Sequence, residues 1–260
     1  MSSFLKKTIL ITGAANGIGK ELALKFDQLS CHKLILVDID QVGLNQLKAK
    51  LNTPTEILKL DLSINFSNDQ ELLEMINNNV IDLVICNAGL GGINPGDSFN
   101  EEINRKMMSV NFFGTSSLVS LILPQMLKRR DGHIVGVASL AGLRGMPQAA
   151  SYSASKAAQI SFLESLRLDL RPYQIKVTTV LPGFIATKMT EHDDFKMPFM
   201  LSSQKTAEKI ITAIKKNKNI YYFPFPMNCL ALFNKFLPVF IYDRLILFLN
   251  PAKKKQAKIF

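Results

Sequence analysis

The spacing most suggestive of chemistry in the chain is a tyrosine followed four residues later by a lysine. Tyr152 and Lys156 lie on one face of a predicted helix. An ammonium group near a phenol lowers the phenol pKa below its usual value of about 10, so Tyr152 is a candidate general acid or base. Ser139 lies 13 residues before Tyr152, directly after a predicted strand, where its hydroxyl could hold a substrate oxygen. The Tyr–Lys spacing is also that of an ordinary exposed pair on a helix, so the pair alone leaves both interpretations open.

A glycine-rich turn follows the first predicted strand and opens a helix. Its glycine spacing is Gly-x-x-x-Gly-x-Gly. Glycines let the backbone turn tightly and approach a pyrophosphate closely, and the helix N-terminus supplies free N–H donors. A turn of this kind also serves simply to join a strand to a helix, so it does not establish a phosphate site alone. The residues predicted to contact a dinucleotide here are Thr12, Gly13, Asn16, Gly17, Ile18 and Gly19.

A carboxylate ends the second predicted strand. Asp38 lies 19 residues beyond Gly19, where it could accept hydrogen bonds from the adenosine ribose hydroxyls. Its charge would repel a 2′-phosphate, no Lys or Arg stands at position 39, and position 16 is Asn. This pattern favours NAD(H) over NADP(H). The alternative is that Asp38 merely begins a turn with Asp40.

Two more groups of residues follow predicted strands and are predicted to line the cofactor. Asp61 and Leu62 come after the third strand, and Asn87, Ala88 and Gly89 come after the fourth. Open parallel sheets bind ligands at the carboxyl ends of their strands. Each group is also common in plain turns.

The elements that must position these residues alternate between short apolar strands and longer helical patterns. The predicted strands cover residues 8–12, 33–38, 55–60, 80–86, 133–138, 175–181 and 220–223. The predicted helices cover residues 17–29, 41–51, 68–78, 101–130, 151–170 and 204–216, the fourth with interruptions near Gly114 and Pro124. Continuously apolar strands indicate burial on both faces, hence a parallel sheet between helix layers. The pattern predicts a Rossmann-type, doubly wound α/β fold of about seven strands.

Composition and charge divide the chain near residue 218. Of its 260 residues 47% are apolar and 20% charged, which excludes a disordered chain and a disulfide scaffold. Residues 205–260 carry 11 basic and two acidic residues, a net charge of +9, whereas residues 1–204 carry only +1. We therefore expect a catalytic and dinucleotide-binding domain over residues 1–218, and an apolar, basic extension over 219–260 that begins with the last strand. Because the body is nearly neutral, we expect no nucleic-acid partner.

The cysteines, histidines and termini add few signals. Three cysteines without a Cys-x-x-Cys pair and three scattered histidines predict no metal site. No secretion signal and no uninterrupted membrane-spanning run are recognisable in the sequence. We therefore expect a protein of the cytoplasm or of a membrane surface.

Together, the motifs resemble those of the short-chain dehydrogenase/reductase family, in order and in spacing, over roughly residues 5–218. The matching residues are Thr12-Gly13-x-x-x-Gly17-Ile18-Gly19, Asp61, Asn87-Ala88-Gly89, Asn111, Ser139, Tyr152-x-x-x-Lys156 and Pro182-Gly183. The chain departs from the family at Cys86, where an Asn is frequent, and in its longer, more apolar extension.

The resemblance implies a role for each residue of the reacting group. Tyr152 would donate a proton to a carbonyl oxygen or remove one from an alcohol, and Ser139 would orient that oxygen. Lys156 would lower the pKa of Tyr152 and bind the nicotinamide ribose, while Asn111 would maintain a water relay to Lys156. The cofactor would also be contacted by Pro182, Gly183 and Thr187, the last at the nicotinamide carboxamide.

By the same resemblance, residues 184–203 form the substrate lid. Methionine and phenylalanine side chains suit a flexible apolar wall, but they would equally seal the domain core. Those of this segment are Phe184, Met189, Phe195, Met197, Phe199 and Met200. A wall of this kind predicts a small apolar alcohol or ketone as substrate, lipid-, retinoid- or steroid-like.

The extension places aromatic and leucine residues beside lysines, a pattern typical of helices that lie on a membrane surface. The alternative is that it packs over the active site or between subunits, since the resemblance implies a homodimer or homotetramer. The predicted function is an NAD(P)-dependent oxidoreductase. The alternatives are an NADPH-preferring carbonyl reductase, and a dinucleotide-binding scaffold or regulator without turnover.

Overall fold

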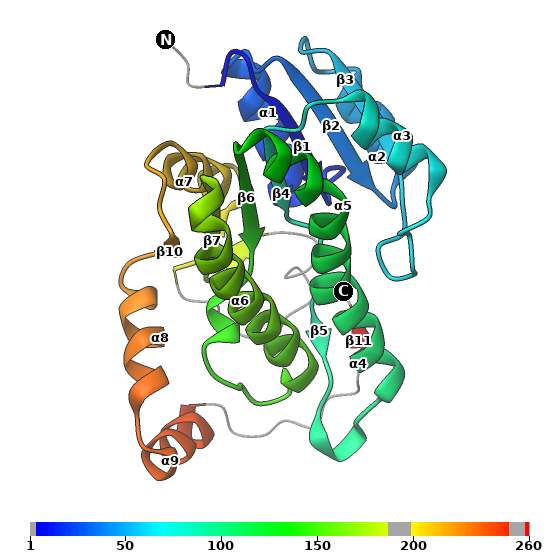
Figure 1. Cartoon of the computed structure of the whole chain (residues 1–260). Coiled ribbons are helices and arrows are strands. Elements are labelled where there is room, and N and C mark those ends of the chain that lie inside the picture. The colour runs from blue at the N-terminus through cyan, green and yellow to red at the C-terminus, as the bar shows by residue number, and fades with distance from the viewer. Residues whose placement is uncertain (1–3, 187–198, 250–257, 260) are drawn as a thin grey trace.

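A seven-stranded parallel sheet with helices on both faces forms the body of the protein (Figure 1). The computed structural model describes residues 4–186, 199–249 and 258–259. Within them the strand order is β10-β7-β6-β4-β1-β2-β3, and every neighbouring pair is parallel. The strands are β1 (Thr8–Thr12), β2 (Lys33–Asp38), β3 (Thr55–Lys59), β4 (Leu83–Cys86), β6 (Gly132–Val137), β7 (Ile175–Pro182) and β10 (Ile220–Phe223). This confirms the Rossmann-type doubly wound fold predicted from the sequence.

The sheet is buried on both sides because each strand contributes side chains to two cores. Ile9 and Ile11 of β1 point into one core and Leu10 between them into the other. The first core is covered by α1 (Gly17–Gln28), α2 (Gln41–Lys48) and α7 (Ser203–Lys215). The second is covered by α3 (Gln70–Asn78), α5 (Gly114–Arg129) and α6 (Ala150–Leu170). The apolar runs of the sequence are therefore strands held between two helix layers.

The long helix predicted over residues 101–130 is divided by a π-helical turn. α4 (Glu101–Met108) leads into the turn Ser109–Phe113, and α5 follows from Gly114. The interruption thus falls just before Gly114, while Pro124 lies inside α5 without ending it. By length and hydropathy Glu101–Arg129 is the one candidate membrane span among the described helices. Its residues Leu118 and Ile122 pack into the second core, beneath the sheet.

The C-terminal part continues the sheet and then leaves it. After β10 come α8 (Met227–Phe236) and α9 (Val239–Leu249), which lie along one flank of the body (Figure 1). Two short pairings complete the described structure. They are β5 (Gly92–Ile93) with β11 (Lys258–Ile259), antiparallel, and β8 (Ile185–Ala186) with β9 (Leu201–Ser202), parallel.

Candidate active site

The predicted cofactor residues meet at the carboxyl ends of β1 and β4, where the strand order reverses. Such a reversal opens a crevice in doubly wound sheets. Thr12 Oγ1 accepts hydrogen bonds from the backbone N–H groups of Asn87 and Ala88, both at 3.1 Å. In return, Asn87 Nδ2 donates to the carbonyl oxygens of Thr12 and Gly13, at 3.0 and 3.2 Å. The two strand ends are thereby locked to each other.

The glycines of the first turn are required by close backbone contacts. Gly13 and Gly17 have φ values of 65° and 53°, a region that favours glycine. A Cβ on Gly19 would lie 2.0 Å from the carbonyl oxygen of Gly13, and one on Gly13 would lie 2.8 Å from Ala88 Cα. The turn therefore offers bare backbone before the N-terminus of α1. This arrangement fits the pyrophosphate of a dinucleotide.

Asp38 holds the glycine-rich turn and the start of α2. Its Oδ2 accepts from the backbone N–H of Ala15 at 2.9 Å, and its Oδ1 from that of Asp40 at 3.0 Å. Asp40 Oδ1 accepts from Gly43 N at 2.9 Å and so caps α2, while Asp40 Oδ2 accepts from Asn16 Nδ2 at 3.3 Å. Asp38 thus makes the turn with Asp40 and is also bound to the glycine-rich turn.

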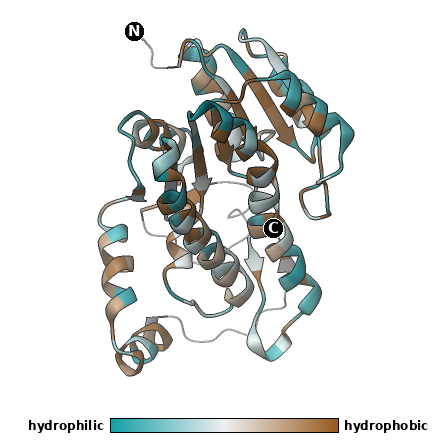
Figure 2. Cartoon of the chain, viewed as in Figure 1, coloured by the Kyte–Doolittle hydropathy of each residue, from teal (hydrophilic) through white to brown (hydrophobic). Residues whose placement is uncertain are grey.

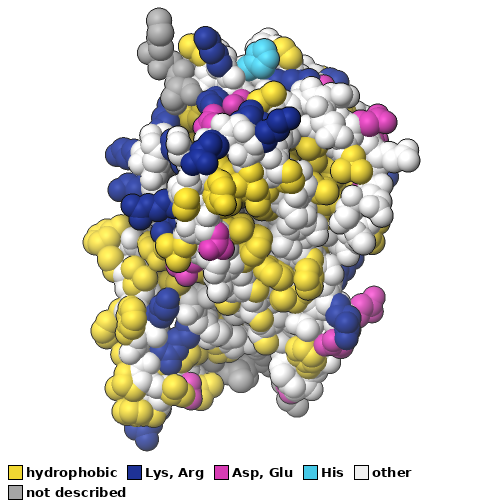
Figure 3. Space-filling view, viewed as in Figure 1, with side chains coloured by type: hydrophobic (Ala, Val, Ile, Leu, Met, Phe, Trp, Pro, Cys, Tyr) yellow, Lys and Arg dark blue, Asp and Glu magenta, His cyan; other side chains and the backbone are white. Residues whose placement is uncertain are grey.

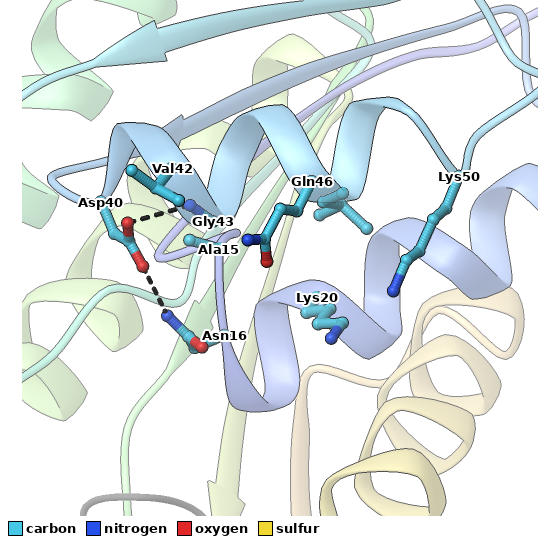
Figure 4. A pocket seen from close by; sticks show the side chains of 9 residues that line it. Ala15, Asn16, Lys20, Asp40, Val42, Gly43, Gln46 and Lys50 are labelled. Carbon is cyan, nitrogen blue, oxygen red and sulfur yellow. Dashed lines mark hydrogen bonds between the residues drawn. The ribbon is translucent and has the colours of Figure 1, made fainter.

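A pocket of about 240 Å³ lies beside these carboxylates, between α1 and α2 (Figure 4). Asp40 and Asn16 lie at one end of it, and Gln46 projects from α2. Lys20 from α1 and Lys50 from beyond α2 line its other part. The pocket therefore has an acidic end beside the glycine-rich turn and a basic part toward the C-terminal end of α2.

Asp61 and Leu62 follow β3 as expected. Asp61 Oδ1 accepts from Ser63 N at 2.8 Å, and hydrogen bonding with Ser63 lowers the pKa of Asp61. Leu62 is buried, and a Cβ on Gly114 would lie 3.1 Å from Leu62 Cβ. Leu62 therefore packs against the start of α5.

Four polar side chains are linked by short contacts, and two of them lie beside Gly89. A Cβ on Gly89 would lie 3.2 Å from Asn111 Oδ1 and 3.4 Å from Lys156 Nζ. Tyr152 stands in the first turn of α6, and Lys156 one turn later, with its ammonium 6.0 Å from the centre of the Tyr152 ring. Ser139 follows β6, forms a hydrogen bond with Tyr152, and accepts from Ala141 N at 3.1 Å. The structure therefore brings together all four residues of the predicted reacting group.

Burial dominates the ionisation of this group. It raises the pKa of Tyr152, and the hydrogen bond with Ser139 lowers that pKa only in part. This direction is opposite to the lowered phenol pKa expected from the sequence, because the cost of burying a phenolate outweighs the attraction of an ammonium 6.0 Å away. Burial also lowers the pKa of Lys156 to about 8.

A buried chain of hydrogen bonds connects Lys156 to Asn111. Lys156 Nζ donates to the carbonyl oxygen of Val137 at 2.9 Å and to Gln159 Oε1 at 3.2 Å. Gln159 Nε2 donates to Thr115 Oγ1 at 3.0 Å, which donates to the carbonyl oxygen of Asn111 at 3.1 Å. The sequence analysis missed Gln159 and Thr115. Gln159 could have been found, because it lies three residues after Lys156 on the same helix face.

The side chain of Asn111, unlike its carbonyl oxygen, lies outside this chain of hydrogen bonds. Its Oδ1 accepts from Leu90 N at 2.7 Å, and its Nδ2 donates to Leu90 O at 3.0 Å and to Ser155 Oγ at 2.9 Å. Asn111 is fully buried in the π-helical turn. It therefore fixes the segment after Gly89 against α6.

The last predicted cofactor residues lie at the end of β7. Pro182 ends the strand, and Gly183 N donates to the carbonyl oxygen of Phe223 at 2.8 Å. A Cβ on Gly183 would lie 2.5 Å from Met227 Sδ, so α8 begins against this turn. Thr187 and three of the predicted lid residues, Met189, Phe195 and Met197, lie outside the described residues. Among the residues that are described, no cluster of three His, Cys, Asp or Glu could hold a metal ion.

Comparison with known proteins adds a family. The family model described as short chain dehydrogenase matches residues 7–198. A Myxococcus xanthus protein named uncharacterized oxidoreductase is 32% identical over 250 residues, which cover 94% of this chain and 97% of the relative. The 17-beta-hydroxysteroid dehydrogenase 13 of Rattus norvegicus is 30% identical over 240 residues, or 89% of this chain and 79% of the relative.

Two solved structures share the fold. A short chain dehydrogenase from Burkholderia cenocepacia, in complex with NADP, superposes with a TM-score of 0.77 at 23% identity, covering 96% of this chain and 99% of that one. A 4-hydroxyisoleucine dehydrogenase complexed with NADH has a TM-score of 0.75 at 24% identity, covering 84% and 97%.

Proposed function

The chain belongs to the short-chain dehydrogenase family, and we propose that it interconverts an alcohol and a carbonyl group with a nicotinamide dinucleotide. The observation that supports this proposal best is that Asn111 and Lys156 lie together beside Gly89, with Tyr152 next to Lys156 and Ser139 hydrogen-bonded to Tyr152. A protein that only bound a dinucleotide would have no need of this group.

The residues that would hold the dinucleotide fit it by their geometry. The bare backbone of Gly13, Gly17 and Gly19 suits the pyrophosphate, and Asp38 suits the ribose hydroxyls. When bound, the nicotinamide supplies or accepts the hydride. The protein contributes position and proton transfer.

Tyr152 is the proposed acid/base. Since burial raises its pKa, the phenol is protonated at neutral pH and can donate to a carbonyl oxygen held by Ser139. Oxidation of an alcohol requires the phenolate, which positive charge near the ring favours. Lys156 places an ammonium 6.0 Å from the ring centre for this purpose.

The proposed substrate is an apolar alcohol or ketone, lipid-, retinoid- or steroid-like. Leu140, which directly follows Ser139, belongs to a small apolar cluster with Ala138 and Leu181, against which Met227 packs. Ser139 is therefore flanked by apolar side chains. The name of the rat relative, a hydroxysteroid dehydrogenase, points to the same class.

The proposed cofactor is NAD(H), because Asp38 and Asp40 bring two carboxylates to the ribose end of the site. NADP(H) is the alternative, supported by Lys20 and Lys50 in the pocket of Figure 4 and by the NADP of the Burkholderia cenocepacia structure. Titration of nicotinamide fluorescence separates them. We expect tighter binding of NADH, and tighter binding of NADPH would select the carbonyl reductase alternative.

The proposed reaction is tested with the variant Tyr152→Phe. Alcohols and ketones of graded chain length are screened through nicotinamide absorbance, first with the unaltered protein. We expect turnover that Tyr152→Phe abolishes while NADH binding is retained. Unchanged turnover in the variant would exclude Tyr152 as the acid/base. Nucleotide binding without turnover of any compound would favour the scaffold alternative.

The assembly proposed for the protein is a homodimer or homotetramer. Leu168 of α6 and Phe113 before α5 are 60% and 55% exposed, so the two long helices present apolar side chains to solvent. Sedimentation velocity over a range of protein concentrations tests this proposal. A monomer at every concentration would contradict it.

A further inference from the structure

The outer faces of α8 and α9 carry large apolar side chains that nothing in the described structure covers. Phe236 and Phe248 are 80% and 83% exposed, and Phe240 is 66% exposed. Figure 2 shows both helices to be largely hydrophobic, and Figure 3 shows hydrophobic side chains gathered along this flank. The other exposed apolar side chains of the two helices are Leu230, Phe233, Val239, Ile241 and Leu247.

The exposed apolar positions of the two helices adjoin one another, and those of α8 form a stripe. In α8, Leu230, Phe233 and Phe236 recur every three residues, which places them on one side of a helix. In α9 the exposed apolar residues include three in succession, Val239, Phe240 and Ile241, so the apolar surface there extends around much of the helix. Contiguous exposed apolar surface of this kind marks an interaction site.

Positive charge accompanies the apolar stripe. Lys235 of α8 and Arg244 of α9 are exposed, and Asp243 is the single acidic residue of 227–249. Residues 205–260 as a whole carry a net charge of +9. Figure 3 shows further Lys and Arg side chains on the same flank, over α7, next to the apolar ones. The surface is therefore both apolar and basic.

The two helices are fastened to the active-site side of the body. Arg144 Nη1 donates to the carbonyl oxygens of Asn234 and Leu237, the latter at 2.7 Å, and its guanidinium lies 3.8 Å from the centre of the Tyr242 ring. Tyr242 is 8% exposed, and its hydroxyl donates to Gly145 O at 2.6 Å. The inner faces are thus held in place, and the apolar outer faces are presented to solvent in a fixed orientation.

We propose that the outer faces of α8 and α9 bind the surface of an anionic lipid bilayer. The helices have 10 and 11 residues, whereas a span needs about 20, so they lie in the interface and do not cross it. Aromatic and aliphatic side chains enter the acyl boundary while lysine and arginine meet the lipid phosphates. A second copy of the chain is a poorer occupant, because it would bring together two surfaces that both carry more basic than acidic side chains.

The proposal goes beyond the proposed reaction and does not depend on it. It also has a geometric consequence, since Met227 at the start of α8 packs beside Leu140, the residue after Ser139. A molecule docked through α8 and α9 therefore has its reacting group on the part of the body to which the lipid-facing helices are attached. This placement suits a substrate that partitions into lipid.

The test is flotation of the full chain with vesicles of equal parts phosphatidylcholine and phosphatidylglycerol, against pure phosphatidylcholine. We expect flotation with the anionic vesicles that high salt weakens. The variant Phe236→Ser/Phe248→Ser should lower the partition coefficient at least about tenfold, since burial of even one phenylalanine side chain raises that coefficient by more than about tenfold. Lys235→Glu/Arg244→Glu should weaken binding to the anionic vesicles more than to the neutral ones.

A matched control removes apolar surface elsewhere. Ile64 and Val80 are 64% and 56% exposed and lie outside α8 and α9, so Ile64→Ser/Val80→Ser should float like the unaltered protein. Thermal melts by circular dichroism confirm that each variant is folded. Absence of flotation at low salt, or equal flotation of Phe236→Ser/Phe248→Ser, overturns the proposal. The proposal is also overturned if the unaltered protein is an oligomer that does not bind vesicles and Phe236→Ser/Phe248→Ser is a monomer. The apolar faces of α8 and α9 would then bind a second copy of the chain.

Discussion

Replacing Lys156 by methionine should remove a pH-dependent cost from the folded protein. Burial lowers the pKa of Lys156 from 10.5 to about 8. Below pH 8 the ammonium is charged in both the folded and the unfolded chain, and its burial destabilises the fold fully. Between pH 8 and 10.5 the folded chain releases the proton first, so this cost is relieved and stability rises with pH.

The size of the effect follows from the two pKa values. Their difference corresponds to about 3 kcal/mol at pH 7, at about 1.4 kcal/mol for each pH unit. Raising the pH from 7 to 9.5 relieves about 2 kcal/mol of that cost. The difference in free energy of unfolding between the unaltered protein and Lys156→Met should therefore shift by about 2 kcal/mol in favour of the unaltered protein from pH 7 to 9.5. The hydrogen bonds to Val137 and Gln159 that the variant loses shift its stability by an amount that is nearly independent of pH.

Urea unfolding of both proteins at pH 7, 8, 9 and 9.5 measures this difference, followed by circular dichroism. Burial raises the pKa of Cys31 to about 11 and that of Cys86 to about 12, and these thiols are present in both proteins, so their contributions cancel. The raised pKa of Tyr152 keeps the phenol protonated in this range. A difference that stays flat, or that falls as the pH rises, would refute the conclusion that Lys156 is desolvated by the fold.

Three further predictions follow from other contacts. Gly19→Ala should weaken NADH binding at least about tenfold in fluorescence titration, because its Cβ would lie 2.0 Å from a carbonyl oxygen, whereas Gly96→Ala, with open space around its Cβ, should bind normally. Gln159→Leu removes one of the two acceptors of the Lys156 ammonium and should lower the pH midpoint of NADH binding by about one unit, while Gln159→Glu should raise it; no movement in either variant would contradict a positioning role. Burial lowers the pKa of His133 from 6.5 to about 4, so acidification from pH 6.5 to 4 should lower the free energy of unfolding by about 2 to 3 kcal/mol in urea unfolding, a loss that His133→Leu should escape.

The sequence predicts the frame of the site because that frame depends on local patterns. Gly13, Asp38 and Asn87 each follow an apolar run, and parallel strands bring their carboxyl ends to one edge of the sheet. The pair Tyr152 and Lys156 is likewise set by helix periodicity. The seven-stranded sheet and the position of the glycine-rich turn were therefore within reach of the sequence.

The remaining features depend on contacts between elements. The pKa of Tyr152 rises because the fold buries its phenol, which no spacing reveals. Thr115 reaches Gln159 only because α5 lies beside α6. The π-helical turn around Asn111 has no distinct periodicity in a sequence that predicts one long helix.

The contacts of Arg144 and Gly145 with α8 and α9 mean that ligand binding at Ser139 and lipid binding by the two helices involve the same turn of the backbone. The turn after Ser139 supplies Arg144 and Gly145, and α8 and α9 supply their partners, Asn234 and Tyr242. If binding of a ligand at Ser139 and Tyr152 shifts this turn, it must also change the orientation that α8 and α9 prefer. Thermodynamic reciprocity then requires that lipid binding by the helices change the affinity of the site for its ligand by the same factor by which the ligand changes the affinity for lipid. Such coupling would be measurable either as a change in lipid affinity when the ligand binds or as a change in ligand affinity when lipid binds.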